Sequence, residues 1–166
     1  MERSRTITWQ NPIEGAQKAT QMSGMDYLQA MTDGQIPLPP LLFTLDFRAV
    51  GFEKGQAIFS FEPQEFHYNP IGTVHGGVIS AILDSAMGCT IHSLLDAGTG
   101  YTTLELKVNF IKAITIKTGK LQAIGKIIHS GKSTALVEAR LIDTNGTLYA
   151  YAVSTCMLLK PTGNIK

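Results

Sequence analysis

The spacing of apolar residues changes near residue 40 and divides the chain into two parts. Residues 1–40 are polar and carry one apolar stripe with a spacing of about three residues, formed by Met22, Met25, Leu28 and Met31. This spacing predicts a helix, and Asn11 followed by Pro12 predicts the start of another. The striped helix is interpreted either as packed onto the main core or as a flexible methionine lid over an apolar ligand.

After residue 40, apolar positions alternate with polar ones, as in strands that bury one face. The alternation from Leu45 to Phe61 predicts a hairpin, and Asn145-Gly146 predicts the turn of a second one. In the strand after Gly98, Leu104 is assigned to the buried face and Thr103 to the opposite face. Further strands are predicted at residues 120–128, 133–142 and 147–159.

The segment Val74–Leu95 differs from both patterns because it is apolar on almost every side. A helix of this kind must be enclosed by other elements. The sequence therefore predicts an α+β fold, an antiparallel β-sheet with one buried central α-helix. We place this domain at residues 41–160, preceded by an N-terminal helical extension at residues 1–40.

Composition limits the classes of function. The 166 residues correspond to one domain, and the formal net charge of +1 does not favour recruitment of nucleic acid or of a membrane. Two cysteines, Cys89 and Cys156, are expected to be free thiols. Without an apolar signal or a membrane-length apolar run, we expect a cytoplasmic protein that acts on a small ligand.

The start of the central helix and one charge inside it carry the candidate chemistry. His75-Gly76-Gly77 opens the helix, where unpaired N–H groups favour an oxyanion or a polarised carbonyl, and glycines let a substrate approach the backbone. Asp84 is a carboxylate in apolar surroundings, an environment that favours a general base or a nucleophile.

Helix geometry separates these two features. Gly76 and Asp84 are eight residues apart, a rise of about 12 Å along a helix, so Asp84 cannot reach a carbonyl held by Gly76 of the same chain. If both act on one substrate, they must come from two chains whose helices lie antiparallel across a two-fold axis. The site therefore implies a homodimer.

Other site chemistries lack their patterns. The histidines His67, His92 and His129 show no metal-ligand spacing, so we expect no metal ion. No serine has a nucleophile-elbow context, and no phosphate-binding or dinucleotide-binding glycine motif is present, so we expect no redox cofactor either.

Three segments together resemble a known family. Asn69–Asp84 (NPIGTVHGGVISAILD), Thr102–Ile111 and His129–Lys132 are similar to the hotdog-fold acyl-CoA thioesterases of the phenylacetic-acid-degradation (PaaI-like) group. The resemblance covers about residues 40–160. It implies a hotdog fold, dimers that join their sheets edge to edge and often pair into tetramers, and hydrolysis of a thioester to a free acid and coenzyme A.

The resemblance also implies roles for individual residues. The N–H of Gly76 would polarise the thioester carbonyl, and Asn69 would help to hold the carbonyl or a water. Asp84 of the partner chain would act as nucleophile or general base. A hydroxyl would position the water, and Thr103 fits this role, with Thr102 as the alternative register.

Additional residues are assigned to positioning and to coenzyme A. His75 caps or orients the start of the helix, and Gly77 is grouped with the substrate-binding residues. By resemblance, the turn containing His129, Gly131 and Lys132 meets the nucleotide end of coenzyme A, where a lysine can face phosphate.

Two alternatives stay open. One is a non-catalytic hotdog protein that binds or senses acyl-CoA, and the other is a hotdog hydratase or dehydratase. A hydratase needs a histidine paired with a carboxylate, and the sequence shows no such local pair.

Overall fold

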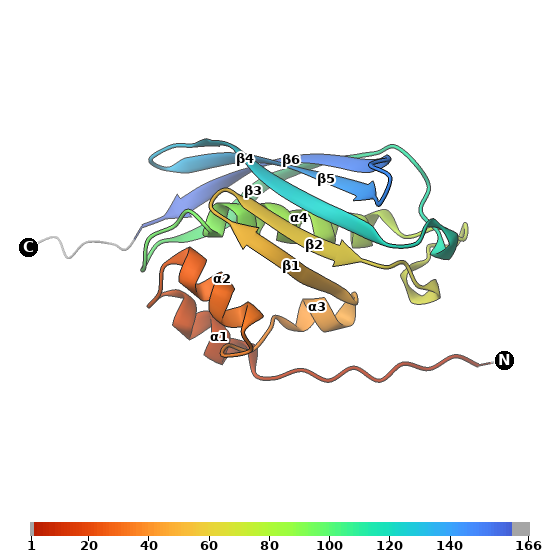
Figure 1. Ribbon diagram of the computed structural model, residues 1–166, viewed down its shortest axis with the longest axis horizontal. Helices are drawn as coiled ribbons and strands as arrows, with labels where there is room; N and C mark the ends of the chain where they lie inside the picture. Colours follow the sequence, from red (N-terminus) through yellow and green to blue (C-terminus); the bar gives the residue numbers. More distant parts are fainter. Residues whose placement is uncertain (1, 161–166) are drawn as a thin grey trace, which may run out of the picture.

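Six antiparallel strands form one sheet that lies over a single long helix (Figure 1). In this computed structural model, which describes residues 2–160, the strand order is β1-β2-β4-β5-β6-β3. The strands are Phe47–Glu53 (β1), Gln56–Phe61 (β2), Gly100–Phe110 (β3), Leu121–Ser130 (β4), Thr134–Asp143 (β5) and Leu148–Leu159 (β6). The predicted α+β class, an antiparallel sheet wrapped around a central helix, is confirmed.

The central helix α4, Gly76–His92, confirms the helix predicted within Val74–Leu95. It is buried along most of its length and packs so closely on the sheet that a Cβ on Gly125 of β4 would lie 2.3 Å from Thr90 Oγ1. Glycine is required at that crossing because no side chain fits between strand and helix. Within residues 2–160, no helix is both long and apolar enough to cross a membrane.

Both predicted hairpins are confirmed. β1 and β2 pair around a turn in which Gly55 has φ +79°, and Asn145-Gly146 connects β5 to β6 with Gly146 at φ +80°. Positive φ is the backbone region that glycine tolerates best, which explains why the turns occur there. In the resulting order, β1 and β3 are the two edges of the sheet.

A β-bulge between Thr103 and Glu105 overturns the predicted faces of β3. A bulge inserts one extra residue, so the alternation of side chains reverses across it. Thr103 faces α4, while Leu104 is 55% exposed instead of buried. Beyond the bulge, Leu106 and Val108 pack against the main core as expected.

Three helices precede the sheet. These are α1 (Pro12–Ala19), α2 (Gly24–Thr32) and α3 (Pro40–Thr44). Asn11 caps α1 as predicted, because its side chain accepts a hydrogen bond from the Ile13 N–H. The helix α3 was not predicted, because the alternating pattern of strands was expected to begin directly after residue 40. Pro40 at the first helical position favours this short helix.

Residues 12–44, called here the N-terminal cap, lie along one side of the molecule beside β1 (Figure 1). The cap has a small core of its own, made of Leu28, Ala30, Met31 and Ile36, against which Phe52 of β1 and Cys89 of α4 pack. It is joined to the end of α4 by a hydrogen bond from the Gly24 N–H to the Leu95 carbonyl, 2.8 Å long. The predicted helix packed onto the core is therefore confirmed.

Candidate active site

Asp84 lies on α4 at the wall of a cavity of about 560 Å³. The Thr103 hydroxyl, from β3, donates a hydrogen bond of 3.0 Å to Asp84 Oδ1. Ser85 and Gly88, on the same side of the helix, also line the cavity. A carboxylate oriented in this way at a largely apolar cavity can take a proton from water or attack a carbonyl carbon.

Of the two threonines considered for this position, Thr103 is the one that contacts Asp84. Thr102 is exposed on the other face of the strand. The assignment of Thr103 to a face away from the core was wrong, because the bulge reverses the alternation here. Its contact with Asp84 nevertheless puts it where a hydroxyl can position a water.

The start of α4 presents a free backbone donor. His75 is the N-cap, and its Nδ1 accepts a hydrogen bond of 2.8 Å from the Gly77 N–H. Among the described residues, no acceptor is paired with the Gly76 N–H. The ring of Phe110 covers this glycine, since an added Cβ would lie 3.1 Å from Phe110 Cζ. The Gly76 N–H therefore fits a carbonyl oxygen or an oxyanion.

Asn69 shapes the loop that leads to this helix. Its Oδ1 accepts hydrogen bonds from the N–H groups of Ile71 and Thr73, at 3.1 and 3.2 Å. Its Nδ2 donates to Thr73 Oγ1 at 2.9 Å. Nδ2 carries two hydrogens, and the described residues provide an acceptor for one of them. Asn69 can thus hold the loop and still donate to a carbonyl or a water.

The two groups of residues lie in separate cavities. Asn69 and Gly76 line a second cavity of about 270 Å³, whereas Asp84 and Thr103 line the larger one. We call the first group, Asn69 with His75 and Gly76, the amide half-site, and we call the pair of Asp84 and Thr103 the carboxylate half-site. One protomer does not bring them together.

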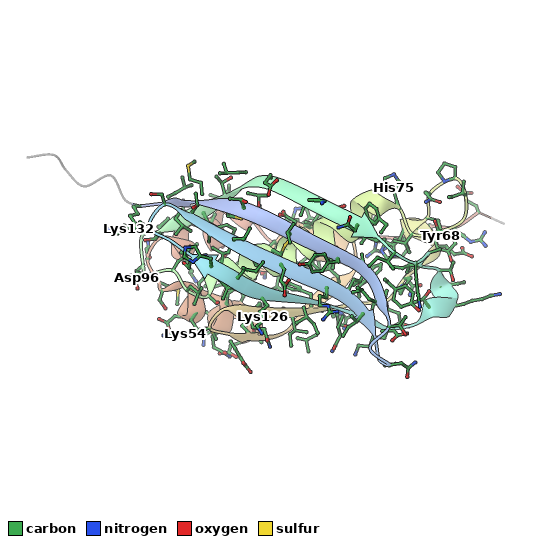
Figure 2. The ribbon with its side chains drawn as sticks, turned by 90° about the horizontal axis from the view of Figure 1, so that it is seen from above. Lys54, Tyr68, His75, Asp96, Lys126 and Lys132 are labelled. Atoms are coloured by element: carbon green, nitrogen blue, oxygen red, sulfur yellow. The ribbon has the colours of Figure 1, made fainter. Side chains whose placement is uncertain are left out.

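The residues expected to contact coenzyme A lie outside both half-sites. The β4–β5 turn, closed by a hydrogen bond of 2.9 Å from the Gly131 N–H to the Thr134 carbonyl, holds Lys132, whereas His129, predicted as part of the turn, lies near the end of β4. Figure 2 shows Lys132 and His75 at opposite ends of the molecule. Gly77, at the helix start, is exposed and donates to its His75 cap.

The ionisable neighbours of Asp84 do not offer a second nucleophile. Burial, with a smaller contribution from the Asp84 carboxylate, raises the pKa of the Cys89 thiol to about 12. Burial likewise raises the pKa of the Tyr101 hydroxyl well above its usual value. Both groups are neutral at pH 7. Within the described part of the chain, no group of three or more His, Cys, Asp or Glu side chains is placed to hold a metal ion.

Sequence reasoning missed several residues of the larger cavity. Tyr101 lies so close to the helix that a Cβ on Gly88 would be 2.6 Å from its hydroxyl oxygen. Met31 and Leu38 of the N-terminal cap also line the cavity. Met31 belongs to the methionine stripe, one interpretation of which was a lid over an apolar ligand, whereas no pattern in the sequence indicates that Leu38 and α4 share a cavity.

This chain is similar in sequence to a known family and to several known proteins. The family model described as "Thioesterase superfamily" matches residues 71–150. A protein of Sulfurisphaera tokodaii named "Putative esterase" is 34% identical over 98 residues. The match covers 59% of this chain and 71% of the relative. The 1,4-dihydroxy-2-naphthoyl-CoA hydrolase of Listeria monocytogenes is 27% identical over 115 residues, which cover 69% of this chain and 90% of the relative.

A solved structure agrees with these matches. A phenylacetic acid degradation-related protein of Ralstonia eutropha JMP134 superposes with a TM-score of 0.72 and 26% identity, covering 79% of this chain and 98% of that one. The resemblance stated from the three sequence segments is confirmed by this likeness and by the family match.

Proposed function

Because this chain belongs to the thioesterase superfamily, we propose that it is an acyl-CoA thioesterase, which hydrolyses an acyl- or aryl-CoA thioester to the free acid and coenzyme A. The observation that carries the assignment of its site is the hydrogen bond from Thr103 to Asp84 at the wall of the large cavity. No metal or redox cofactor takes part in this proposal.

The reaction needs a polarised carbonyl and a positioned carboxylate. The Gly76 N–H, at the positive end of the α4 dipole, donates a hydrogen bond to the thioester oxygen and stabilises the negative charge that develops on it. Asp84 acts as general base, taking a proton from a water whose oxygen bonds to the carbonyl carbon, or attacks that carbon itself to form an acyl anhydride that water then hydrolyses to the free acid. When the carbon–sulfur bond breaks, the sulfur leaves with the electron pair and is protonated to the thiol of coenzyme A.

Two protomers complete one site. The amide half-site and the carboxylate half-site line separate cavities on the same helix, so a second copy of the chain must supply the missing half. The edge strand β3, which carries Thr103, pairs only with β6 among the described residues. We propose that two β3 edges meet in a homodimer, and that dimers pair into a homotetramer.

The β4–β5 turn supplies the contact with the nucleotide end of coenzyme A. Lys132 provides a point charge for phosphate, the Gly131 N–H closes the turn, and His129 lies beside Gly131 near the end of β4. Cys89 and Cys156 are both free thiols, which fits a reducing compartment such as the cytoplasm.

The direct test is coenzyme A release, followed with a thiol dye, from acetyl, hexanoyl, decanoyl, palmitoyl, phenylacetyl and benzoyl thioesters. Asp84→Asn keeps the shape of the side chain and removes its negative charge, so we expect turnover to fall about 10²–10⁴-fold. Asp33→Asn, a change of the same type at an exposed carboxylate outside both half-sites, serves as the matched control.

Two outcomes contradict the proposal. Unchanged turnover in Asp84→Asn would exclude the carboxylate half-site as the catalytic group. Tight binding of acyl-CoA without release of coenzyme A from any thioester would support the binding or sensing protein instead.

A further inference from the structure

We propose that the N-terminal cap forms the far wall of the acyl pocket and makes this enzyme selective for apolar straight-chain acyl groups of about eight to twelve carbons. This inference rests on the proposed thioesterase function. It assigns a role to a segment that lies outside the matched family region, residues 71–150.

The large cavity extends from the carboxylate half-site to the cap. Its wall follows α4 from Asp84 through Gly88 to Cys89 and continues onto Met31 and Leu38. Cys89 packs against the small core of the cap, so helix and cap meet at that point. Within the described residues, the cavity beside Asp84 therefore continues to the cap, and we assign this direction to the acyl chain.

The length of this path sets the chain length. Five helical residues from Asp84 to Cys89 span about 7.5 Å, and an extended hydrocarbon advances about 1.3 Å per carbon. About six carbons thus reach Cys89, and further carbons contact Met31 and Leu38. The volume of about 560 Å³ is that of pockets which enclose drug-sized ligands, far more than an acetyl group fills.

The lining selects an uncharged group. Apolar side chains from the cap, from β1 and from β2 surround the path, among them Leu42, Phe43, Phe47, Phe52 and Phe59. The charged residues on the wall are Asp84 itself, with Asp46 and Arg48, which are exposed at the start of β1. Carbons of an acyl chain that move from water into this lining are stabilised, and the stabilisation increases with each added methylene.

The cap is anchored firmly enough to act as a wall. Arg5 donates hydrogen bonds to the carbonyl oxygens of Phe43 and Thr44, at 2.6 and 2.9 Å, and its guanidinium lies 4.0 Å from the ring centre of Phe66. At the other end, the Gly24 N–H is bonded to Leu95 after α4. The cap is thus held by Arg5 at the end of α3 and by Leu95 at the start of α2.

The test compares two opposite substitutions at one position. Leu38→Trp shortens the cavity, and Leu38→Ala lengthens it, in a half-buried loop outside any helix or strand. We measure kcat/KM with acetyl-, hexanoyl-, decanoyl- and dodecanoyl-CoA by coenzyme A release. In the unmodified protein, decanoyl-CoA should exceed acetyl-CoA at least tenfold; Leu38→Trp should lower that ratio about tenfold or more, and Leu38→Ala should move the optimum toward dodecanoyl-CoA.

Matched controls separate selectivity from damage to the cap. Ile13 of α1 is 59% exposed and outside the cavity, so Ile13→Trp and Ile13→Ala should leave the chain-length profile unchanged. Opposite shifts at Leu38 cannot arise from simple loss of stability. An unchanged profile in both Leu38 variants, or equal kcat/KM for acetyl- and decanoyl-CoA in the unmodified protein, would overturn the inference.

Calorimetric titration of the same thioesters into Asp84→Asn measures binding apart from hydrolysis. It therefore distinguishes failure of this inference from failure of the proposed function. If no thioester is hydrolysed, binding that strengthens with chain length and shifts in the Leu38 variants still supports the cap as the acyl wall, while the thioesterase proposal fails. Binding that is independent of chain length overturns the inference by itself.

Discussion

The two half-sites on α4 are built in different ways. The amide half-site comes from one continuous segment of the chain, which supplies the Gly76 N–H, its exposed His75 cap, and a loop tied together by the Asn69 side chain. The carboxylate half-site is made of side chains from two distant segments, because Asp84 is on the helix and Thr103 on β3. The first therefore depends on local geometry, and the second depends on how strand and helix pack.

This difference in construction corresponds to two chemical tasks. The amide half-site polarises the carbonyl, and the carboxylate half-site transfers the proton. A helix start offers an oriented donor in any protein that forms the helix, so the amide half-site needs little support from the rest of the fold. A carboxylate must be held at a defined angle beside the carbonyl carbon, which requires Thr103 and the cavity wall. If the proposed dimer forms, each active site combines one half-site of each kind.

The largest expected effect comes from mixed dimers, in which one chain lacks the carboxylate half-site and the other chain lacks the amide half-site. Asp84→Asn removes one half-site, and Gly76→Val blocks the other, because an added Cβ already lies 3.1 Å from the Phe110 ring. Each variant alone should lose about 10²–10⁴-fold in turnover. Mixed dimers, isolated with two different affinity tags, should recover about half of the normal activity per dimer, since each contains one intact site.

Controls make this complementation decisive. Gly51→Val alters a glycine whose added Cβ would meet nothing within 4 Å, so it should keep its activity. Dimers in which both of the differently tagged chains carry Asp84→Asn should stay inactive. Mixed dimers as inactive as their parents would show that the two half-sites do not combine across chains.

A smaller effect is expected from the hydroxyl in the carboxylate half-site. Thr103→Val keeps the shape of the side chain and removes its hydrogen bond to Asp84, which should lower kcat about 10- to 150-fold, because a hydrogen bond to a charged group is worth about 1.5–3 kcal/mol. Thr102→Val, at the exposed neighbouring threonine, should leave kcat unchanged. Equal losses in both variants would indicate damage to β3 and not the loss of this contact.

The amide half-site was readable from the sequence because its signals are local. His75 followed by two glycines predicted a helix start with free N–H groups, and Asn69 before Pro70 fits the observed side chain-to-backbone bonds of the loop. Asp84 was readable as a lone charge in an apolar helix. The threonine that bonds to Asp84 was predicted only as Thr103 or Thr102, because no sequence pattern shows the bulge that turns Thr103 inward.

The same distinction holds for the fold. The sheet, both hairpins and α4 follow from apolar spacing and turn residues, which act over short distances. The helix α3 was missed because its five residues are too few to show a helical period. The contribution of Leu38 to the large cavity depends on packing between segments far apart in the chain, which a single sequence does not encode in any local pattern.

A modest loss of stability is expected at the amide half-site. His75→Ala removes the acceptor for the Gly77 N–H, which should cost about 1 kcal/mol and lower Tm by about 2–4 °C. His75→Asn supplies another acceptor and should restore Tm. If His75→Asn restores Tm and coenzyme A release stays low, His75 acts on the substrate as well as on the helix.

The smallest effect concerns the opposite end of α4, where the helix meets the N-terminal cap. His92 is 8% exposed, lies between the rings of Tyr27 and Tyr101, and has no hydrogen-bond partner for either ring nitrogen among the described residues. Burial lowers the pKa of His92 below its usual value of 6.5. The unfolded chain therefore takes up a proton more readily, and the stability that the neutral ring provides is present above pH 6.5 and is lost as pH falls below it.

His92→Leu removes this linkage while keeping an apolar side chain in the same place. We expect its Tm, relative to the unmodified protein, to be higher at pH 5 than at pH 8, because replacing an unpaired buried polar group is neutral or stabilising and removes the proton uptake. His67, whose pKa burial also lowers, is present in both proteins, so the difference between them isolates His92. Parallel Tm curves from pH 8 to pH 5 would show that His92 is protonated as easily in the folded chain as in the unfolded one, and that the junction of α4 and the cap is open to water.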